Sequence, residues 1–416
     1  MNLKKLSFFI LVFLQICTLK LFSENVTFTT PQTLFSPSVD AFNITTDSSG
    51  RYGYVVLEDD NDKITVFVSS DFGKTWTDID SSRTIFLTGG DPQIITDRSG
   101  KYVYLVFKEG TASPGAIKAF VSSNFGQTWT ETTSSFGDGS IPQITTDNSG
   151  KYVYLIWQDN VPDIITFVSS DFGKTWTDTT RPFGNGFNPQ ITTDSSGKNV
   201  YVIFSEGGFT FILNSLDFGQ TWTVVLPGMF GINPQITTDS TGKNVYAIFR
   251  EPAPKIYISN DFGTTWRQAT DSFSVIALNP QIITDSSGSF IYAIWRDGDD
   301  KAKIFISLNF GSTWKETFTS TGEGHETQIT TDISGRYVYA IFRDASVNIK
   351  IFGSLDFGLT WIDMDSTDTF FGNGINPQII TSSTGSKIYG AWDGATLPIT
   401  TGLRSFFPLN SVSINR

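Results

Sequence analysis

Two patterns of apolar and polar residues alternate along this chain. In Pro-Gln-Ile-Thr-Thr, which occurs several times, apolar and polar positions alternate with the period of a half-buried strand. Nearly continuous runs of β-branched and aromatic residues, such as 200–204, are typical of strands covered on both faces. Between the two patterns lies Asp-Ser-Ser-Gly, a turn sequence whose glycine readily adopts a positive φ. The pattern predicts antiparallel hairpins, and no unit has the period of a helix.

The hairpin pattern recurs at intervals of 45 to 50 residues. Its eight turn glycines are Gly50, Gly100, Gly150, Gly197, Gly242, Gly288, Gly335 and Gly385. A second motif, Ser-x-Asp-Phe-Gly-x-Thr-Trp, has seven copies that end at Trp76, Trp129, Trp176, Trp222, Trp266, Trp314 and Trp361. A third apolar run precedes this motif and a short polar stretch follows it, so each unit contains four predicted strands. Four antiparallel strands in a repeat of this length are typical of a β-propeller blade.

The sequence therefore predicts an all-β fold, a β-propeller of four-stranded antiparallel blades. Eight hairpins against seven second motifs indicate eight blades, with the last blade completed by strands from both termini. The segment 397–407 resembles a degenerate third strand, and 26–35 resembles a fourth. Seven blades with unpaired ends is the alternative. In either case residues 24–416 form a single domain.

The first 23 residues have the pattern of a secretory signal peptide. Lys4 and Lys5 precede an apolar run over 6–19, and Ser23 is a small residue before the expected cleavage point. The run is shorter than the roughly 20 apolar residues that span a bilayer. We expect residues 1–23 to be removed and the chain to be secreted or kept in the cell envelope, with no transmembrane segment after removal. A membrane anchor is the alternative.

Composition narrows the function further. The chain has 29 Lys+Arg against 41 Asp+Glu, a net charge of −12, which argues against nucleic acid or an anionic membrane as partner. Its one cysteine, Cys17, and one histidine, His325, exclude Cys/His zinc sites, disulfides and cysteine nucleophiles. The acidic stretches 58–62 and 297–300 lack a calcium-loop spacing and are expected to be solvated turns. We expect no metal, no cofactor and a monomer.

The second motif resembles the Asp box, or BNR repeat, of the sialidase-like superfamily, which also includes non-enzymatic propellers. The resemblance implies the fold over nearly the whole mature chain but not an activity. The residues at the Asp position are Asp71, Asn124, Asp171, Asp217, Asp261, Asn309 and Asp356. We expect each side chain to accept hydrogen bonds from the N–H groups of its own turn. Asparagine keeps the acceptor oxygen without the charge, so the box is predicted to be structural and to bind no metal.

The resemblance also implies that the Asp-box turns share one face and that ligands bind at the opposite one. The position after each second-strand apolar run differs between repeats: Glu58, Lys108, Gln158, Ser205, Arg250, Arg296, Arg343 and Asp393. Three consecutive arginines could bind a carboxylate or phosphate. The loop 322–328 adds Glu323, His325 and Glu326, which could act as acid and base. These six residues are the candidate ligand-binding residues; surface ion pairs and an ordinary solvated loop are the alternatives.

The tyrosines bear on catalysis. Sialidases use an arginine triad, a tyrosine nucleophile paired with a glutamate, and an aspartate acid/base. Here no Arg-Ile-Pro motif is present, twelve of the thirteen tyrosines occupy second-strand repeat positions, and Tyr257 occupies a third-strand position. We therefore assign no catalytic residue and expect a non-catalytic propeller that binds a glycan, peptide or protein. A sialidase-like exo-glycosidase and a structural protein of an envelope or matrix are the alternatives.

Overall fold

The structure, a computed structural model, describes residues 39–394 except for 81–87, 111–113, 133–135, 161–162, 181–185, 270–272, 274–275 and 365–370. It describes the backbone alone at 32–33, 395–396 and 400–406. The predicted signal peptide, residues 1–23, lies outside the described residues. Every regular element in the described part is a β-strand. A search of these residues found no helix long and apolar enough to cross a membrane.

The strands follow the repeats. The first strands are β2 (Val39–Thr46), β6 (Gly89–Thr96), β10 (Asp138–Thr146), β14 (Phe187–Thr193), β18 (Ile232–Thr238), β22 (Leu278–Thr284), β26 (His325–Thr331) and β30 (Ile375–Thr381). The second strands are β3 (Gly53–Asp59), β7 (Val103–Glu109), β11 (Val153–Gln158), β15 (Val200–Glu206), β19 (Val245–Glu251), β23 (Ile291–Arg296), β27 (Val338–Arg343) and β31 (Ile388–Thr396).

The third strands are β4 (Ile64–Ser69), β8 (Gly115–Ser122), β12 (Ile164–Ser169), β16 (Phe209–Ser215), β20 (Ala253–Ser259), β24 (Ala302–Ser307), β28 (Ile349–Ser354) and β32 (Thr400–Phe406). The fourth strands are β5 (Thr77–Asp78), β9 (Thr130–Glu131), β13 (Thr177–Asp178), β17 (Thr223–Phe230), β21 (Arg267–Gln268), β25 (Lys315–Thr319), β29 (Ile362–Asp363) and β1 (Gln32–Thr33). The segments 26–31, 34–35, 397–399 and 407, which belong to the two predicted terminal strands, lie outside the described residues.

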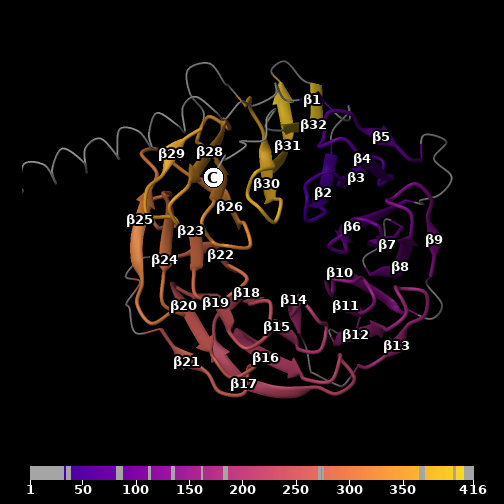
Figure 1. Ribbon diagram of the computed structural model, residues 1–416, viewed down its shortest axis with the longest axis horizontal. Helices are drawn as coiled ribbons and strands as arrows, with labels where there is room; N and C mark the ends of the chain where they lie inside the picture. Colours follow the sequence, from indigo (N-terminus) through magenta and orange to yellow (C-terminus); the bar gives the residue numbers. More distant parts are fainter. Residues whose placement is uncertain are drawn as a thin grey trace, which may run out of the picture.

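Each repeat forms a four-stranded antiparallel sheet in chain order, such as β14-β15-β16-β17. Pairing between β8 and β10 joins two of these units into one eight-stranded sheet. At the termini, the backbone of β1 pairs with β32, which follows β31 and β30 in the same sheet. The sheets stand around a central axis, with first strands innermost and fourth strands outermost (Figure 1). This is the all-β, blade-like arrangement of a β-propeller that the repeat predicts.

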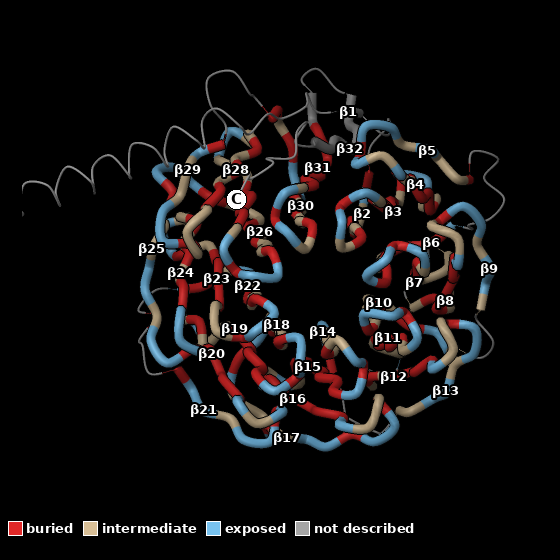
Figure 2. The backbone as a smooth tube through the Cα atoms, in the orientation of Figure 1, coloured by how far each residue is buried: buried red, intermediate tan, exposed pale blue. Residues whose placement is uncertain are grey.

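The core lies between neighbouring sheets. The second strands are buried along most of their length, whereas the turns and the outer strands are exposed (Figure 2). This explains why their sequences are continuously apolar, because both faces of each sheet are covered. Each second strand also buries a tyrosine, whose hydroxyl needs a hydrogen-bond acceptor inside this core. The Tyr246 hydroxyl, for example, donates to the carbonyl of Gly288 in the next repeat at 2.6 Å.

The same bond recurs from repeat to repeat. Its donors and acceptors are Tyr54 to Gly100, Tyr104 to Gly150, Tyr154 to Gly197, Tyr201 to Gly242, Tyr246 to Gly288, Tyr292 to Gly335, Tyr339 to Gly385 and Tyr389 to Gly50. Burial raises the pKa of each of these hydroxyls well above its ordinary value. The turns themselves are also linked. Ser48 N–H donates to Arg98 O at 3.0 Å, and Ser383 N–H donates back to Ser48 O at 2.9 Å.

The Asp boxes have the structural role predicted for them. Oδ1 of Asp71 accepts the N–H of Thr75 at 2.9 Å, and its Oδ2 accepts the Thr75 hydroxyl at 2.7 Å. Burial alone would raise the pKa of Asp71, but the hydrogen bonds from Thr75 and Ser69 outweigh it and hold this pKa below its ordinary value. Asn124 accepts the N–H of Thr128 at the same 2.9 Å. The amide therefore replaces the carboxylate, and the charge is not needed for the geometry.

Each box also holds a phenylalanine in the left-handed conformation, which the sequence did not reveal. Phe125 has φ of 61° and the following Gly126 has φ of 77°. A side chain at positive φ is strained. The Phe125 ring stacks on Tyr52 of the preceding repeat at a centroid distance of 4.5 Å, which offsets part of that cost. The box therefore joins two neighbouring sheets.

Antiparallel pairing gives the molecule two unlike faces. The Asp boxes and the turns between first and second strands lie together at one end, where Phe72 N–H donates to Arg51 O at 3.0 Å. We call this the Asp-box face. The opposite end carries the turns between second and third strands and a bulge near the start of most first strands, such as the one at Asn188 with φ of 52°. We call it the bulge face.

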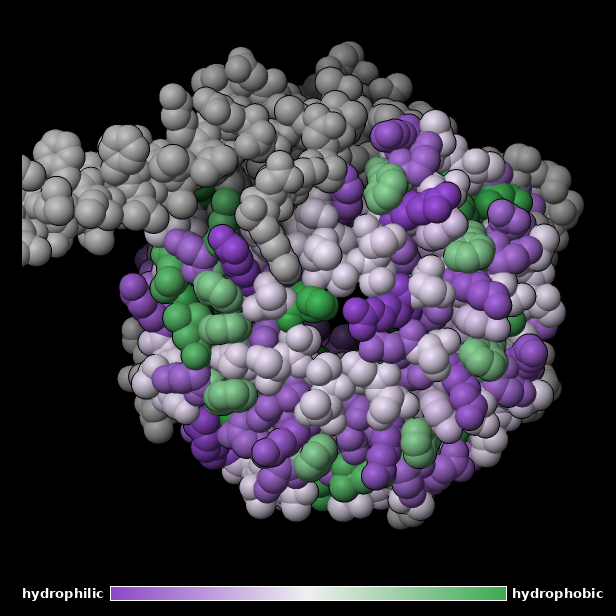
Figure 3. Space-filling view, viewed as in Figure 1, coloured by the Kyte–Doolittle hydropathy of each residue, from purple (hydrophilic) through white to green (hydrophobic). Residues whose placement is uncertain are grey.

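Figure 3 shows one face of the molecule, on which hydrophilic residues dominate. Hydrophobic residues stand mostly singly there, except on the side of the ring that carries β24 and β28 (Figure 3). The exposed Leu308 and Leu359 belong to the Asp-box turns that follow these two strands. Both side chains are therefore on the Asp-box face.

The fourth strands differ in length more than the sequence predicted, which was a short polar strand in every repeat. Six of the eight have only two residues, as expected for an outer edge that must not pair with other chains. In contrast, β17 has eight residues and pairs with β16 as far as Phe230, opposite Phe209. The sequence of β17, Thr-Val-Val-Leu-Pro-Gly-Met-Phe, is apolar enough to remain paired to the rim of the sheet.

Candidate functional site

The variable residues that end the second strands lie at equivalent places on the bulge face. Each pairs with a first-strand residue at or just before the bulge: Glu58 with Ala41, Lys108 with Gly90, Gln158 with Ser140, Ser205 with Phe187, Arg250 with Ile232, Arg296 with Leu278, Arg343 with His325, and Asp393 with Ile375. We call these eight residues the rim positions. The structure thus groups them as the repeat alignment predicted.

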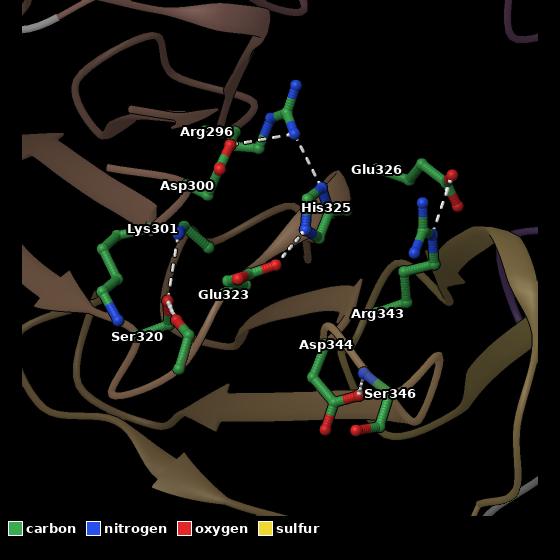
Figure 4. A network of polar contacts seen from close by, with 12 residues as sticks. Arg296, Asp300, Lys301, Ser320, Glu323, His325, Glu326, Arg343, Asp344 and Ser346 are labelled. Atoms are coloured by element: carbon green, nitrogen blue, oxygen red, sulfur yellow. Dashed lines mark hydrogen bonds and ion pairs between the residues drawn. The ribbon is translucent and has the colours of Figure 1, made fainter. Parts of the chain in front are cut away.

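Arg296 and the histidine loop form one polar network (Figure 4). Arg296 NH1 lies 2.7 Å from Nδ1 of His325 and 3.0 Å from Oδ1 of Asp300. A guanidinium can only donate, so Nδ1 must accept and the ring proton must reside on Nε2. Nε2 in turn lies 2.9 Å from Oε2 of Glu323. His325 is therefore held between Arg296 and Glu323, with only 17% of its side chain exposed.

Arg343 and Glu326 form a second, separate pair (Figure 4). Nε of Arg343 lies 2.9 Å from Oε1 of Glu326, without the alignment of a hydrogen bond, so the contact is an ion pair. The other carboxylate oxygen of Glu326 accepts the N–H of Asn376 from the next repeat at 2.6 Å. Glu326 therefore ties two neighbouring sheets together and neutralises Arg343 at the same time.

Arg250 differs from the other two arginines. Among the described residues it has no ion pair with a carboxylate, and the adjacent Glu251 pairs instead with Lys255 at 3.6 Å. The acids that follow the other two arginines in sequence are also engaged elsewhere. Asp297 and Asp344 accept N–H groups of their own hairpin turns, for example from Lys301 and Asn348. The three arginines are thus equivalent in position, but Arg250 alone of the three has no ion pair among the described residues.

The sequence reasoning missed four exposed apolar residues at one end of neighbouring strands, which we call the apolar cluster. Phe187, Phe209, Phe230 and Ile232 are exposed by 44%, 39%, 61% and 39% of their surface. They are the first residues of β14 and β16, the last of β17 and the first of β18, so all four lie at the bulge-face end. A detectable signal was available: Phe187 and Ile232 directly precede Asn-Pro-Gln, at the strand end where a solvent-facing residue is expected.

Two carboxyls on the bulge face were also passed over. Burial raises the pKa of Glu58 to about 7. The charges of Asp91, Asp40 and Asp62 also raise this pKa, whereas the hydrogen bond from Asp91 N–H lowers it by less than burial raises it. Burial, with a smaller contribution from the charge of Asp40, raises the pKa of Asp393 to about 6. Both residues occupy rim positions, so the list of variable residues contained them. Their burial, which causes the effect, is a property of the tertiary structure alone.

Candidate metal ligands are absent from the described part of the chain. No group of three or more His, Cys, Asp or Glu side chains there could hold a metal ion. In the acidic loop after β3, the buried Asp59 accepts the N–H groups of Asn61 and Lys63, each at 2.9 Å. These carboxylates therefore shape hairpin turns. The expectation of no cofactor remains a prediction.

Comparisons with known proteins address the fold and the repeats. A family model described as BNR-Asp box repeat matches residues 66–79 and 167–179, which contain the first and third boxes. No curated protein matches the chain.

Three solved structures illustrate the similarity. A prolyl endopeptidase has a TM-score of 0.57 and 12% identity over 88% of this chain and 55% of that chain. YCF48 from Cyanidioschyzon merolae has a TM-score of 0.51 and 14% identity over 92% of this chain and 98% of that chain. A GH74 enzyme from Niastella koreensis has a TM-score of 0.45 and 14% identity over 85% and 68%.

At such low identity the solved structures speak for the fold alone. The two segments that match the family model contain Asp71 and Asp171, each of which accepts the N–H of a threonine in its own turn at 2.9 Å. These findings agree with the four-stranded sheets of the structure. The chain is a β-propeller that carries BNR-Asp box repeats.

Proposed function

We propose that this chain is an exported, non-catalytic propeller that binds a glycan, peptide or protein ligand on its bulge face. The observation that carries the proposal is the group of exposed apolar residues Phe187, Phe209, Phe230 and Ile232 at the bulge-face end of neighbouring strands. Ile232 is the cross-strand partner of Arg250, which has no ion pair among the described residues. Apolar groups clustered around an arginine are the composition of binding hot spots. Export rests on residues 1–23, which the structure does not describe, and the net charge of −12 argues against nucleic acid as ligand. We propose a monomer without cofactor.

We further propose that residues 24–416 form one ring of eight blades, closed by β1 and β32. The pairing of Gln32 with Ser405 supports this closure. So do the bonds from the last repeat to the first, in which Tyr389 donates to Gly50 and Ser383 to Ser48. A ring closed in this way leaves no exposed sheet edge at its seam.

The tyrosines favour binding over a sialidase-like reaction. All thirteen are described, and eight of them donate buried hydrogen bonds to the glycine carbonyls of the next repeat. Of the three candidate arginines, Arg296 and Arg343 already neutralise carboxylates of this chain. A substrate carboxylate would have to compete with these partners.

One observation favours an exo-glycosidase as second candidate. A carboxyl with a pKa of about 7, such as Glu58, is the kind of group that can serve as a general acid. In that case Glu58 would protonate a leaving-group oxygen on the bulge face. The experiment below separates the two functions.

The test combines turnover and binding on the purified protein. A panel of fluorogenic sialosides and other glycosides measures hydrolysis, while glycan and peptide arrays measure binding. We expect no turnover, and array binding that is lost in a Phe230→Ser, Arg250→Gln double variant but kept in Leu359→Ser, which changes an exposed residue of the Asp-box face. Turnover that disappears in Glu58→Gln would overturn the proposal in favour of a glycosidase. Binding that the double variant leaves intact would show that the bulge face is not the ligand site.

A further inference from the structure

The loop 322–326 is attached to the repeats on both sides of it. Gly324 N–H donates to the carbonyl of Asp300, in the turn between β23 and β24, at 2.7 Å. On the other side, Glu326 accepts the N–H of Asn376 at 2.6 Å. His325 stands between these two attachments in the sequence, and its ring contacts Arg296 (Figure 4). The histidine is therefore part of a link between three neighbouring repeats.

The contact between His325 and Arg296 requires a neutral imidazole. NH1 of Arg296 lies 2.7 Å from Nδ1, and Nδ1 has to accept because a guanidinium only donates. The proton on Nε2 then points to Glu323, at 2.9 Å. In a protonated ring both nitrogens donate, so Nδ1–H would face an N–H of Arg296. The arrangement in the structure is therefore incompatible with a protonated His325.

Protonation would also disturb the ion pair of Arg296. Oδ1 of Asp300 lies 3.0 Å from the same NH1. If the protonated Nδ1 takes this carboxylate as its acceptor, Arg296 loses its partner; if it does not, two donors face each other. In either case Arg296 has to move away from Nδ1. Because the carbonyl of Asp300 accepts Gly324 N–H, this movement acts on the turn that anchors the loop.

The net charge around His325 does not oppose an added proton. The neighbouring strand ends and loops carry the charged residues Arg296, Asp297, Asp299, Asp300, Lys301, Lys303, Glu323, Glu326, Arg343 and Asp344. Six of these are acidic and four are basic. The strands β22 and β30, which pack beside β26, have no titratable residue. The hydroxyls of Tyr292 and Tyr339, on β23 and β27, bond to glycine turns of the opposite, Asp-box face.

We propose that His325 is a pH-sensitive latch on the bulge face. The neutral ring holds the loop 322–326 against Arg296, and a proton taken up from solvent by Nδ1 displaces Arg296 and loosens the loop from the turn at Asp300. Histidine is the side chain that ordinarily changes its charge between pH 5 and 8. The inference goes beyond the proposed function, because it concerns the state of this loop whichever ligand binds the bulge face.

The first test observes the ring directly, since the chain has a single histidine. Nuclear magnetic resonance on protein labelled with nitrogen-15 in the imidazole reports which ring nitrogen carries the proton. We expect a proton on Nε2 alone at about pH 8 and on both nitrogens at about pH 5. A proton on Nδ1 alone at the higher pH, or a ring that is still neutral at the lower pH, would overturn the inference.

The second test measures hydrogen exchange of the loop by mass spectrometry. The reference is Gly231, whose N–H makes the equivalent bond to Gly208 O at 2.9 Å in repeats without a histidine. Dividing by this reference removes the pH dependence of exchange itself. We expect the relative protection of Gly324 to fall about tenfold between about pH 8 and pH 5, the effect of losing one hydrogen bond to a charged group.

Variants assign the change to the histidine. In His325→Gln the amide oxygen can accept from Arg296 and the amide nitrogen can donate to Glu323 without titrating, so the loop should stay protected at both pH values. Arg296→Gln removes the guanidinium that conflicts with the protonated ring, so the change with pH should become smaller. Lys108→Gln, at a rim position in a repeat without histidine, should behave as the wild type.

Two further outcomes would overturn the latch. One is a wild-type loop whose exchange follows that of Gly231 at both pH values. The other is a His325→Gln loop that loosens on acidification as much as the wild type does. The thermal unfolding midpoint shows whether each variant is folded, and Arg296→Gln provides an independent test if His325→Gln is not.

Discussion

The two faces of this propeller are built from the same strands but are subject to different constraints. At the Asp-box face the repeats are nearly identical, because each turn must satisfy its own N–H groups and also contact the next sheet, as Phe125 does with Tyr52. At the bulge face the rim positions range from Asp393 and Glu58 through Ser205 to Arg250. One face thus stabilises the ring, and the other is free to differ. Repetition marks structural residues here, and departures from it mark the candidate site.

The largest expected effect comes from emptying the core between sheets. Tyr246→Ala removes a fully buried ring and its 2.6 Å bond to Gly288. We expect a loss of about 3–5 kcal/mol in the free energy of unfolding, measured by urea denaturation. Tyr246→Phe, which loses only the hydroxyl bond, should cost about 1–2 kcal/mol. If the two variants were equally stable, packing would not be the main contribution of this residue.

The Asp boxes should contribute to stability through the side-chain oxygen that accepts the hydrogen bonds of the turn. Asp71→Ala leaves the Thr75 N–H without its 2.9 Å partner and is expected to cost about 1–2 kcal/mol in urea denaturation. Asp71→Asn should cost less than about 0.5 kcal/mol, because Asn124 makes the equivalent bond at the same distance. A much larger cost for asparagine than for alanine would contradict the view that the charge is dispensable.

A fall in pH should change the contributions of the Asp boxes and of the acidic rim residues to the free energy of unfolding in opposite directions. The pKa of Asp71 is lowered on folding, so its contribution is present at neutral pH and is lost as the pH falls through that lowered value. Glu58 and Asp393 instead bind their protons more tightly when folded, with pKa values of about 7 and about 6 against ordinary values of 4.5 and 3.8. Their contribution is therefore full at low pH and is lost as the pH rises from about 4 to 7.

The variant Glu58→Gln measures how much this rim carboxyl contributes to the pH dependence of stability. Its free energy of unfolding should vary less between pH 4 and 7 than that of the wild type, because the amide cannot ionise. Urea denaturation across this range is the measurement, and Asp138→Asn, at the exposed start of β10, is the control. An unchanged pH dependence in Glu58→Gln would show that this carboxyl does not titrate in the stated window.

The smallest effect on stability should come from the apolar cluster. The free energies of unfolding of Phe230→Ser and Arg250→Gln are expected to lie within about 0.5 kcal/mol of the wild type, because Phe230 is exposed and Arg250 is partly exposed. Urea denaturation measures this directly. A loss above about 2 kcal/mol in either variant would mean that the bulge face, too, is needed to hold the ring together.

Much of the fold could be predicted because the residue pattern within each repeat indicates where its strands and turns lie. Asp71 and its six equivalents were expected to accept N–H groups of their own turns, and each does so in the structure. The candidate site was less accessible to this reasoning. Surface ion pairs were an alternative for Arg296 and Arg343, but the partners, Asp300 and Glu326, could be identified only from the structure.

The sequence by itself determined the local structure, because strand alternation, turn glycines and Asp-box hydrogen bonds act over a few residues and repeat with the motif. Only the tertiary structure decided which rim residues form ion pairs and that Glu58 and Asp393 are buried. It also decided that four apolar residues at the ends of β14, β16, β17 and β18 remain exposed. Those properties depend on distances between strands of different repeats. Such distances follow from how the sheets pack around the axis, which no single repeat encodes.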